Sequence, residues 1–515
     1  MPAMETYGTP HAFAAAAGTP YAAEAAAEVY RSGGNAVDAA VAAAAAVGVT
    51  EPLMSSIGGG GFALVRTPRG EVEVVDFFDV MPGKGLPPSA FGAGGNPHTI
   101  LLDYGAGVSS IVGGPSVAVP GSVRGWEELL RRHGRLGLEE VLAPAVRLAR
   151  EGFRLCRTSA LWFRVAREVL ALTEETRQNF YKDGRVYEEG EEMRFPELAD
   201  TLEAIGREGA DLFYEGWLGQ KISAYVREMG GLVTERDLAE YRPEIRRPLS
   251  VGYRDGEVHT NGPPSAGGAT LAQMLLIVAG YDLPSLPEEE YVRVVAGAMR
   301  LALLDREESY ADGPRNAEVV ERLLGEEHIA SQRRRLFGPH TTHLSCADAE
   351  GYAVAITASM GYGSGLVVPG TGIPLNNVLG EPELNPKGFH ALAPGERPVS
   401  SMSPTIVCSA EEGVIALGSP GATRIPTAIL QTILNVVDLG MPLEGAVLAP
   451  RFHAEDGLFA YEAGARAADL GPYERVLVYD EPSMYFGGVN AVRRTPQGTF
   501  EAAADPRRSG GAAYA

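Results

Sequence analysis

The sequence predicts a mixed α/β fold, because helix-like and strand-like segments alternate along the chain. Residues 22–31 and 36–47 have helical patterns, residues 62–66 form a short apolar run typical of a strand, and residues 342–359 have the pattern of a hairpin. At 515 residues the chain corresponds by length to two to four domains, although one large sandwich is equally compatible.

The first two helices are bounded by recognisable signals. Ser32, Gly33 and Gly34 close the first helix, and Asn35 is a candidate N-cap with Asp38 three residues further on. The alanine-rich helix that follows is too short to span a membrane and carries Asp38. We therefore expect it to pack against a sheet in the core.

A run of glycines at Gly58–Gly61 formally matches the G-x-G-x-x-G/A dinucleotide pattern. That pattern requires a strand before it and a helix after it. Here a helix and a loop precede the glycines and a strand, Phe62–Arg66, follows them. A coenzyme-dependent enzyme built on these glycines is thus the weaker alternative, and no cofactor is predicted.

The hairpin near the middle of the chain carries the most informative residues. Its strands are Thr342–Ala347 and Tyr352–Ser359, joined by a turn that ends at Gly351. If Gly351 takes the left-handed position of a three-residue loop, paired positions sum to 700 and Thr341 lies opposite Ser359. Two hydroxyl groups would then face each other.

A threonine hydroxyl needs an adjacent base to act as a nucleophile, and no His/Asp pair at a recognisable spacing supplies one. A free α-amine, with an unperturbed pKa of about 7.7 to 8.0, would serve. Cleavage between His340 and Thr341 would make Thr341 both nucleophile and base. His340 and His343 also form an H-x-x-H, but such positions point to opposite faces of a strand, so no metal site is predicted.

A second hairpin, from residues 405–409 and 414–417, runs into the turn Gly418–Ala422 and then into an amphipathic helix from about Thr423. The apolar positions of this helix are spaced by four, at Ile425, Ile429, Ile433 and Val437. A glycine-rich turn that enters a helix presents unpaired N–H groups, which suit an anion. For amide hydrolysis that anion is the tetrahedral oxyanion, and one donor contributes about 3 to 4 kcal/mol.

Composition excludes several kinds of partner. The net charge of −22 and a pI near 4.9 argue against nucleic acid and against an anionic membrane surface. Cys156, Cys346 and Cys408 are too few and too far apart for a disulfide framework or a zinc site. Residues 1–10 lack the pattern of a secretory signal, so we expect a cytoplasmic protein with a small-molecule substrate.

Four ordered motifs resemble the γ-glutamyltranspeptidase family of N-terminal nucleophile hydrolases, and the similarity extends from about His11 to Gly510. These motifs are Thr341–Ser345, Asn376-Asn377, Arg397–Thr405 and Gly418–Arg424. The resemblance implies a four-layer αββα sandwich. It also implies a precursor that cleaves itself into a large segment, 1–340, and a small segment, 341–515, which stay together. A homo-oligomer of such heterodimers is compatible with it.

The resemblance also implies roles for individual residues. Thr341 would be the nucleophile, Ser359 would orient its hydroxyl, and Ser400 and Ser401 would hold a carboxylate of the acyl group. The family forms its oxyanion hole from a Gly-Gly pair, which is Gly421-Ala422 here. Because the donors are backbone N–H groups, alanine is suitable provided that its dihedral angles are not left-handed.

The residues that recognise the substrate depart from the family pattern. The family's carboxylate-binding arginine is replaced by Phe78, and the groups that hold the α-ammonium are replaced by Gly361, Val378 and Glu381. Of these, Glu381 alone could pair with an ammonium.

These departures leave three readings of the function open. The first is a self-processing amidohydrolase or acyltransferase that acts on an amide of a carboxylated acyl group. That acyl group is either γ-glutamyl, as in glutathione, or a simpler acid without the α-amine. A cephalosporin-acylase-like or other small-amide hydrolase is one alternative. An uncleaved homologue that binds a ligand without catalysis is another.

Overall fold

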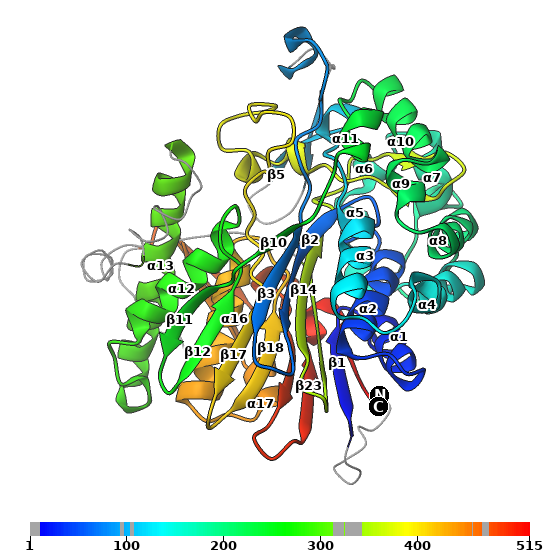
Figure 1. The fold of residues 1–515 in the computed structure, drawn as a ribbon. Helices are drawn as coiled ribbons and strands as arrows, with labels where there is room; N and C mark the ends of the chain where they lie inside the picture. Colours follow the sequence, from blue (N-terminus) through cyan, green and yellow to red (C-terminus); the bar gives the residue numbers. More distant parts are fainter. Residues whose placement is uncertain are drawn as a thin grey trace.

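Two β-sheets stack face to face and each is covered by helices on its outer side, which gives the predicted four-layer αββα sandwich (Figure 1). The computed structural model describes residues 11–92, 97–102, 108–312, 324, 342–455, 457–465 and 473–515. Within this part of the chain, no helix is long and apolar enough to cross a membrane.

The first sheet has seven strands in the order β10-β3-β2-β14-β13-β1-β24. Their bounds are β1 (Phe13–Ala17), β2 (Gly60–Arg66), β3 (Val72–Phe77), β10 (Glu244–Arg246), β13 (Thr342–Asp348), β14 (Ala353–Ser359) and β24 (Gly511–Tyr514). Its outer face is covered by α1 (Pro20–Arg31), α2 (Ala36–Thr50) and α3 (Ser122–His133), with α4 (Leu138–Glu151) packed behind them.

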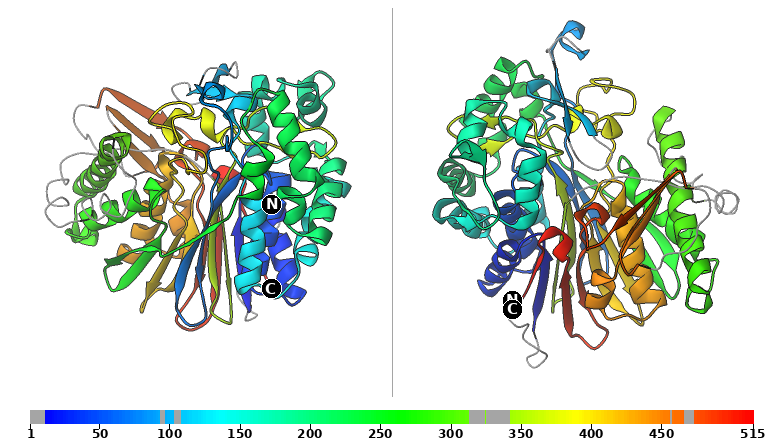
Figure 2. Two further views of the ribbon diagram at one scale, coloured as in Figure 1. Left: turned by 45° about the horizontal axis from the view of Figure 1, so that its top comes forward. Right: turned by 180° about the vertical axis from the view of Figure 1, so that it is seen from behind.

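The second sheet has six strands in the order β11-β12-β17-β18-β22-β23. Their bounds are β11 (Leu249–Tyr253), β12 (Gly256–Thr260), β17 (Thr405–Ser409), β18 (Gly413–Gly418), β22 (Asn490–Arg494) and β23 (Phe500–Ala504). The helices α12 (Ala266–Val278), α13 (Glu288–Asp312) and α16 (Arg424–Ile433) lie on its outer side, as both views in Figure 2 show.

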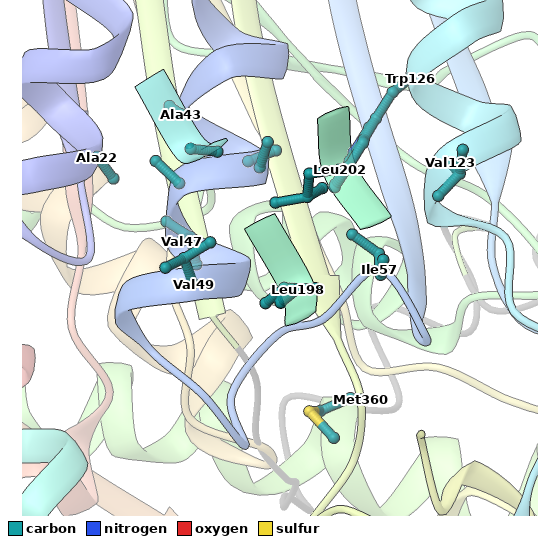
Figure 3. Packing of buried hydrophobic residues seen from close by; sticks show 14 of the residues in the cluster. Ala22, Ala43, Val47, Val49, Ile57, Val123, Trp126, Leu198, Leu202 and Met360 are labelled. Atoms are coloured by element: carbon teal, nitrogen blue, oxygen red, sulfur yellow. The ribbon is translucent and has the colours of Figure 1, made fainter. Parts of the chain in front are cut away.

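Residues 153–239 form the mixed helix and loop region that extends the first helical layer. Its longer helices are α5 (Arg157–Val165), α7 (Glu174–Phe180), α8 (Pro196–Glu208), α10 (Trp217–Glu228) and α11 (Glu235–Ala239). Figure 3 shows Leu198 and Leu202 of α8 in the same buried cluster as Ala43, Val47 and Val49 of α2.

Three apolar clusters correspond to the three interfaces between the four layers. Alternate residues of each strand point to opposite faces, so Ala15 of β1 packs against the outer helices while its neighbour Ala14 faces the second sheet. Likewise, Val354 and Ala355 of β14 belong to different clusters. The third cluster, which includes Leu271 of α12, joins the second sheet to its own helices.

The capping signals predicted for α2 are confirmed. The Asn35 side chain accepts hydrogen bonds from the N–H groups of Val37 and Asp38, and the Asp38 carboxylate accepts one from the Asn35 N–H at 2.8 Å. The helix continues to Thr50 and all its residues are buried. An alanine-rich sequence therefore forms a helix that lies close against the first sheet.

The glycine run leads into a strand rather than a nucleotide-binding turn, as the sequence predicted. A Cβ atom on Gly59 would lie 2.3 Å from the Ser359 carbonyl oxygen, and one on Gly61 would lie 2.4 Å from that of Thr357. These glycines allow β14 to approach closely, and β14 carries the candidate catalytic hydroxyl of Ser359.

The strands before and after residue 341 are interleaved. β13 and β14 lie between β2 and β1 in the first sheet, and β12 pairs with β17 in the second. A cut before residue 341 would therefore leave both sheets held together by hydrogen bonds and packing. The segments 1–340 and 341–515 are thus not separate globular units.

Helix α16 departs from the prediction at its end. After Ile433 the chain makes a π-helical turn, Leu434–Asp438, before Gly440 ends the segment with a positive φ of 61°. The wider turn shifts the buried face by one residue. Val436 is consequently buried, whereas the predicted Val437 is partly exposed.

Candidate active site

The hairpin β13–β14 has the predicted register. Thr342 pairs with Ala358 and His343 with Thr357, so paired positions sum to 700, and Gly351 has a positive φ of 105°. The same register matches residue 341 to Ser359. Thr341 and His340 lie outside the described residues, however, so the pairing of Thr341 stays a prediction.

A pocket of about 730 Å³, partly open to solvent, lies at the end of β14. It brings together Ser359, Ala422 and the serine pair, which are far apart in the sequence. The residues that line it are Met54, Phe78, Trp162, Ser359, Gly361, Tyr362, Val378, Glu381, Glu383, Leu384, Ser400, Ser401, Met402, Ala422, Met484 and Arg508. Apart from Thr341 and His340, Gly421 is the one predicted site residue that does not line this pocket.

Hydrogen bonds leave the pocket hydroxyls able to donate. The Ser359 Oγ accepts from the Gly361 N–H at 2.9 Å, and the Ser400 Oγ accepts from the Met402 N–H at 3.1 Å. A serine hydroxyl carries one proton and two lone pairs, so each of these oxygens can still donate its own proton. Both hydroxyls can therefore donate to a carboxylate.

The serine pair is fixed by the start of α12. The carbonyl oxygen of Ser400 accepts hydrogen bonds from the Ala266 N–H and the Ser265 Oγ, at 2.9 and 3.2 Å. A Cβ atom on Gly267 would lie 2.1 Å from the Ser401 carbonyl oxygen. The Pro263–Ser265 turn and this glycine therefore set the position of both serines.

The turn before α16 carries the two predicted oxyanion donors, Gly421 and Ala422. No hydrogen bond from the N–H of Gly421 or Ala422 is found among the described residues. Gly421 has a φ of 130° and Ala422 a φ of 53°. Ala422 therefore does not meet the condition that its dihedral angles avoid the left-handed region, and its role as an oxyanion donor stays a prediction. Its Cβ atom costs about 1 kcal/mol there, and packing of Gly421 against Gly487 holds the turn in place.

Glu381 lies inside the pocket, where it occupies space beside Gly361. A Cβ atom on Gly361 would lie 2.1 Å from the Glu381 Oε1, so the glycine and the longer acidic side chain fit together. Glu381 is buried, and its Oε1 has no hydrogen-bond partner among the described residues. Burial and the nearby carboxylates of Glu383 and Asp79 raise the pKa of Glu381 well above its usual value.

Comparison with known proteins identifies the family. A family model of the γ-glutamyltranspeptidases matches residues 22–515. The chain belongs to this family. It is 34% identical to the acylase ACY 1 proenzyme of Pseudomonas sp. (strain SE83), over 95% of this chain and 91% of that protein. It is 33% identical to the glutathione hydrolase proenzyme of Escherichia coli (strain K12), over 83% and 78% of the two chains.

A solved structure agrees with these sequence relatives. The crystal structure of cephalosporin acylase from Bacillus halodurans superposes with a TM-score of 0.83, at 28% identity, over 100% of this chain and 97% of that one. The chain is thus a γ-glutamyltranspeptidase-like amidohydrolase.

Two motifs that mark the γ-glutamyltranspeptidase family have supporting contacts here. The Asn376 side chain donates to the Gly58 carbonyl and to the Asp79 carboxylate, and Asn377 accepts from the Tyr362 N–H at 2.7 Å. The Arg397 guanidinium pairs with the buried Asp76 carboxylate at 3.1 Å. The Arg397 contact joins the loop that carries the serine pair to the end of β3.

At the family's arginine position, Phe78 is buried in the pocket wall, where its ring stacks on Phe62 with centroids 5.4 Å apart. Val378 is fully buried in the same wall. An apolar surface therefore replaces the family's guanidinium and one of its ammonium ligands. The departures predicted from the sequence are present in the pocket.

His343 is buried between the two sheets, one residue after the start of β13. Its Nδ1 lies 2.8 Å from the Thr357 Oγ1, and its Nε2 lies 2.8 Å from the Ser345 Oγ. Burial lowers the pKa of His343 to about 3, so the ring is neutral. Nowhere in the described ranges do three or more His, Cys, Asp or Glu side chains gather in a way that could hold a metal ion.

This neutral histidine predicts acid sensitivity. The unfolded chain takes up a proton near pH 6.5 and the folded chain only near pH 3, so this stabilisation is complete above about pH 6.5 and decreases as the pH falls. At pH 5 we expect the free energy of unfolding to be about 2 kcal/mol lower than it is above pH 6.5. Urea unfolding of a Thr341→Ala chain, with and without His343→Gln, measures it. With the exposed control His98→Gln, the free energy of unfolding should fall with pH as much as it does without it, whereas His343→Gln should remove this fall. The same pH dependence of the free energy of unfolding in all three proteins would contradict the prediction.

Several pocket residues were missed by the sequence analysis. Trp162 and Tyr362 form one wall, with ring centroids 5.7 Å apart, and Arg508 donates to the Met484 carbonyl at 3.3 Å. Arg306, in α13, was also missed; it does not line the pocket, but its guanidinium donates to the Ser401 Oγ. No residue pattern marks any of them, because they come from distant segments and belong to no recognisable motif.

Proposed function

We propose that this protein cleaves itself between His340 and Thr341 and then hydrolyses amides of a carboxylated acyl group, with a preference for acyl groups that lack an α-amine. The observation that carries the proposal is the composition of the pocket. Donor hydroxyls are present at Ser400 and Ser401, whereas the positions that would surround an ammonium hold apolar groups and Glu381, a buried carboxyl group whose pKa is raised.

The reaction begins at Thr341. Its free α-amine accepts the proton of the hydroxyl, and the oxygen attacks the amide carbon. The N–H groups of Gly421 and Ala422 donate to the oxyanion that develops, and the O–H of Ser359 donates to the nucleophile oxygen. The leaving amine takes the proton from the threonine amine, and an ester between the acyl group and Thr341 remains. Water, or an acceptor amine, then cleaves this ester.

The charge balance of the pocket selects the acyl group. A terminal carboxylate meets the hydroxyls of Ser400 and Ser401, whereas an α-ammonium meets Phe78, Val378 and the Glu381 carboxyl group, whose pKa is raised by burial. Burying an ammonium without a charged partner costs several kcal/mol. The relatives named acylase fit this preference, and the relatives named glutathione hydrolase represent the competing substrate class.

We expect the processed enzyme to hydrolyse a glutaryl anilide at least about tenfold more efficiently than the γ-glutamyl anilide, which corresponds to about 1.4 kcal/mol. The two substrates differ only in the α-amine, so the ratio of their kcat/KM values measures its cost in the transition state. A γ-glutamyl preference of about a hundredfold would contradict the proposal. It would show that Glu381 ionises and rebuilds an ammonium site.

Two further features belong to the proposal. The cytoplasmic location stays a prediction, which fractionation of the producing cells would test. Assembly of processed heterodimers into a homo-oligomer also stays a prediction, and sedimentation of the processed protein would test it.

A further inference from the structure

Arg306 contacts the serine pair from outside the recognised motifs. It lies in the last part of α13, and its guanidinium Nη2 donates to the Ser401 Oγ at 2.9 Å. Both residues are buried, with exposed fractions of 7% and 3%.

The backbone that carries Arg306 is held in place by the neighbouring helix, α12. Asp305, the preceding residue, accepts a hydrogen bond from the Gln273 side chain of α12, and both are buried. α12 is also the helix whose first turn holds the Ser400 carbonyl. Arg306 and the serine pair are therefore positioned by the same helix.

The contact determines which way the Ser401 hydroxyl acts. A guanidinium has only donors, so the Ser401 Oγ must accept, and its own proton is left for another acceptor. A positive charge on the accepting side makes that O–H a stronger donor. The Ser400 Oγ accepts from the backbone N–H of Met402 instead, so its own O–H is likewise left to donate.

Arg306 also acts on the charge of the pocket. Burial raises the pKa of Glu383 in the pocket wall, and the positive charge of Arg306 opposes that rise. The guanidinium also contacts the Ser401 Oγ, so its positive charge lies next to the hydroxyl at which the carboxylate is proposed to bind.

We infer that Arg306 is a positioning residue that sets the preference for an anionic acyl end: through Ser401 it supplies the positive charge that Phe78 cannot. This inference rests on the proposed function, since it assigns a source of charge to the same carboxylate site. Its substrate class is an amide whose acyl group ends in a carboxylate.

The test compares a charged and a neutral form of one acyl group. The substrates are the glutaryl anilide and its methyl ester, and the proteins are processed wild type, Arg306→Gln, Arg306→Lys and the control Arg293→Gln. Arg293 is an exposed residue of the same helix. For Arg306→Gln we expect kcat/KM on the glutaryl anilide to fall about 10- to 100-fold, mainly through KM. The value for the ester should change less than about threefold, and Arg293→Gln should resemble wild type.

Equal losses on both substrates would show a purely structural role and overturn the inference, as would an unchanged glutaryl KM. If Arg306→Gln is not processed, Arg306→Lys carries the test through competitive inhibition by glutarate. A lysine keeps the charge but loses the fork geometry, so weaker inhibition is expected and an unchanged inhibition constant would overturn the inference. If wild type itself does not prefer the carboxylated substrate, the proposed function fails instead.

Discussion

A Thr341→Ala protein should remain one chain of 515 residues and should lose amide hydrolysis by at least about 10⁴-fold. The substitution removes the oxygen that attacks both the His340 carbonyl and the substrate. Thr341→Ser keeps a hydroxyl and should still be cut. Denaturing gel electrophoresis and an anilide assay measure the two effects.

The neighbouring residue provides the control for this prediction. Thr342→Ala changes the next threonine of the chain, the first residue of β13, and this protein should be processed like the wild type. Normal processing of Thr341→Ala would show that another residue is the nucleophile, and the whole site assignment would then be lost.

Ser400→Ala should raise KM for a glutaryl anilide about 10- to 100-fold with a smaller change in kcat. A hydrogen bond to a charged group contributes about 1.5 to 3 kcal/mol, and this one is made in both the ground and transition states. The matched control is Ser403→Ala. Ser403 is equally buried but donates to the Ser401 carbonyl and does not line the pocket.

The result that would contradict this role is a fall in kcat with KM unchanged. That pattern would place Ser400 in the chemical step instead of in carboxylate binding. A similar loss in Ser403→Ala would show that the loop position matters and the hydroxyl does not.

Local signals in the sequence predicted much of the fold. The capping box at Asn35, the hairpin turn at Gly351 and the strand after Gly58–Gly61 each depend on residues close in sequence, and all three are present. The π-helical turn after Ile433 was not predictable, because tertiary packing and not residue type inserts the extra residue.

The site was predicted in part, for a related reason. Motifs and register placed Ser359, the serine pair and Ala422 in one pocket, and the structure brings them together. The left-handed conformation of Ala422 could not be foreseen, since the surrounding packing imposes it against the preference of alanine. The fit of Glu381 beside Gly361, and the reach of Arg306 to Ser401, depend on contacts between segments far apart in sequence.

The most direct test of the central claim is peptide mass spectrometry of the enzyme quenched in acid during turnover of a glutaryl anilide. We predict a small fragment that begins at Thr341 and carries the glutaryl group on that residue. An acyl group on Ser359 or Ser400, or an acylated chain that is still uncut before Thr341, would contradict the claim.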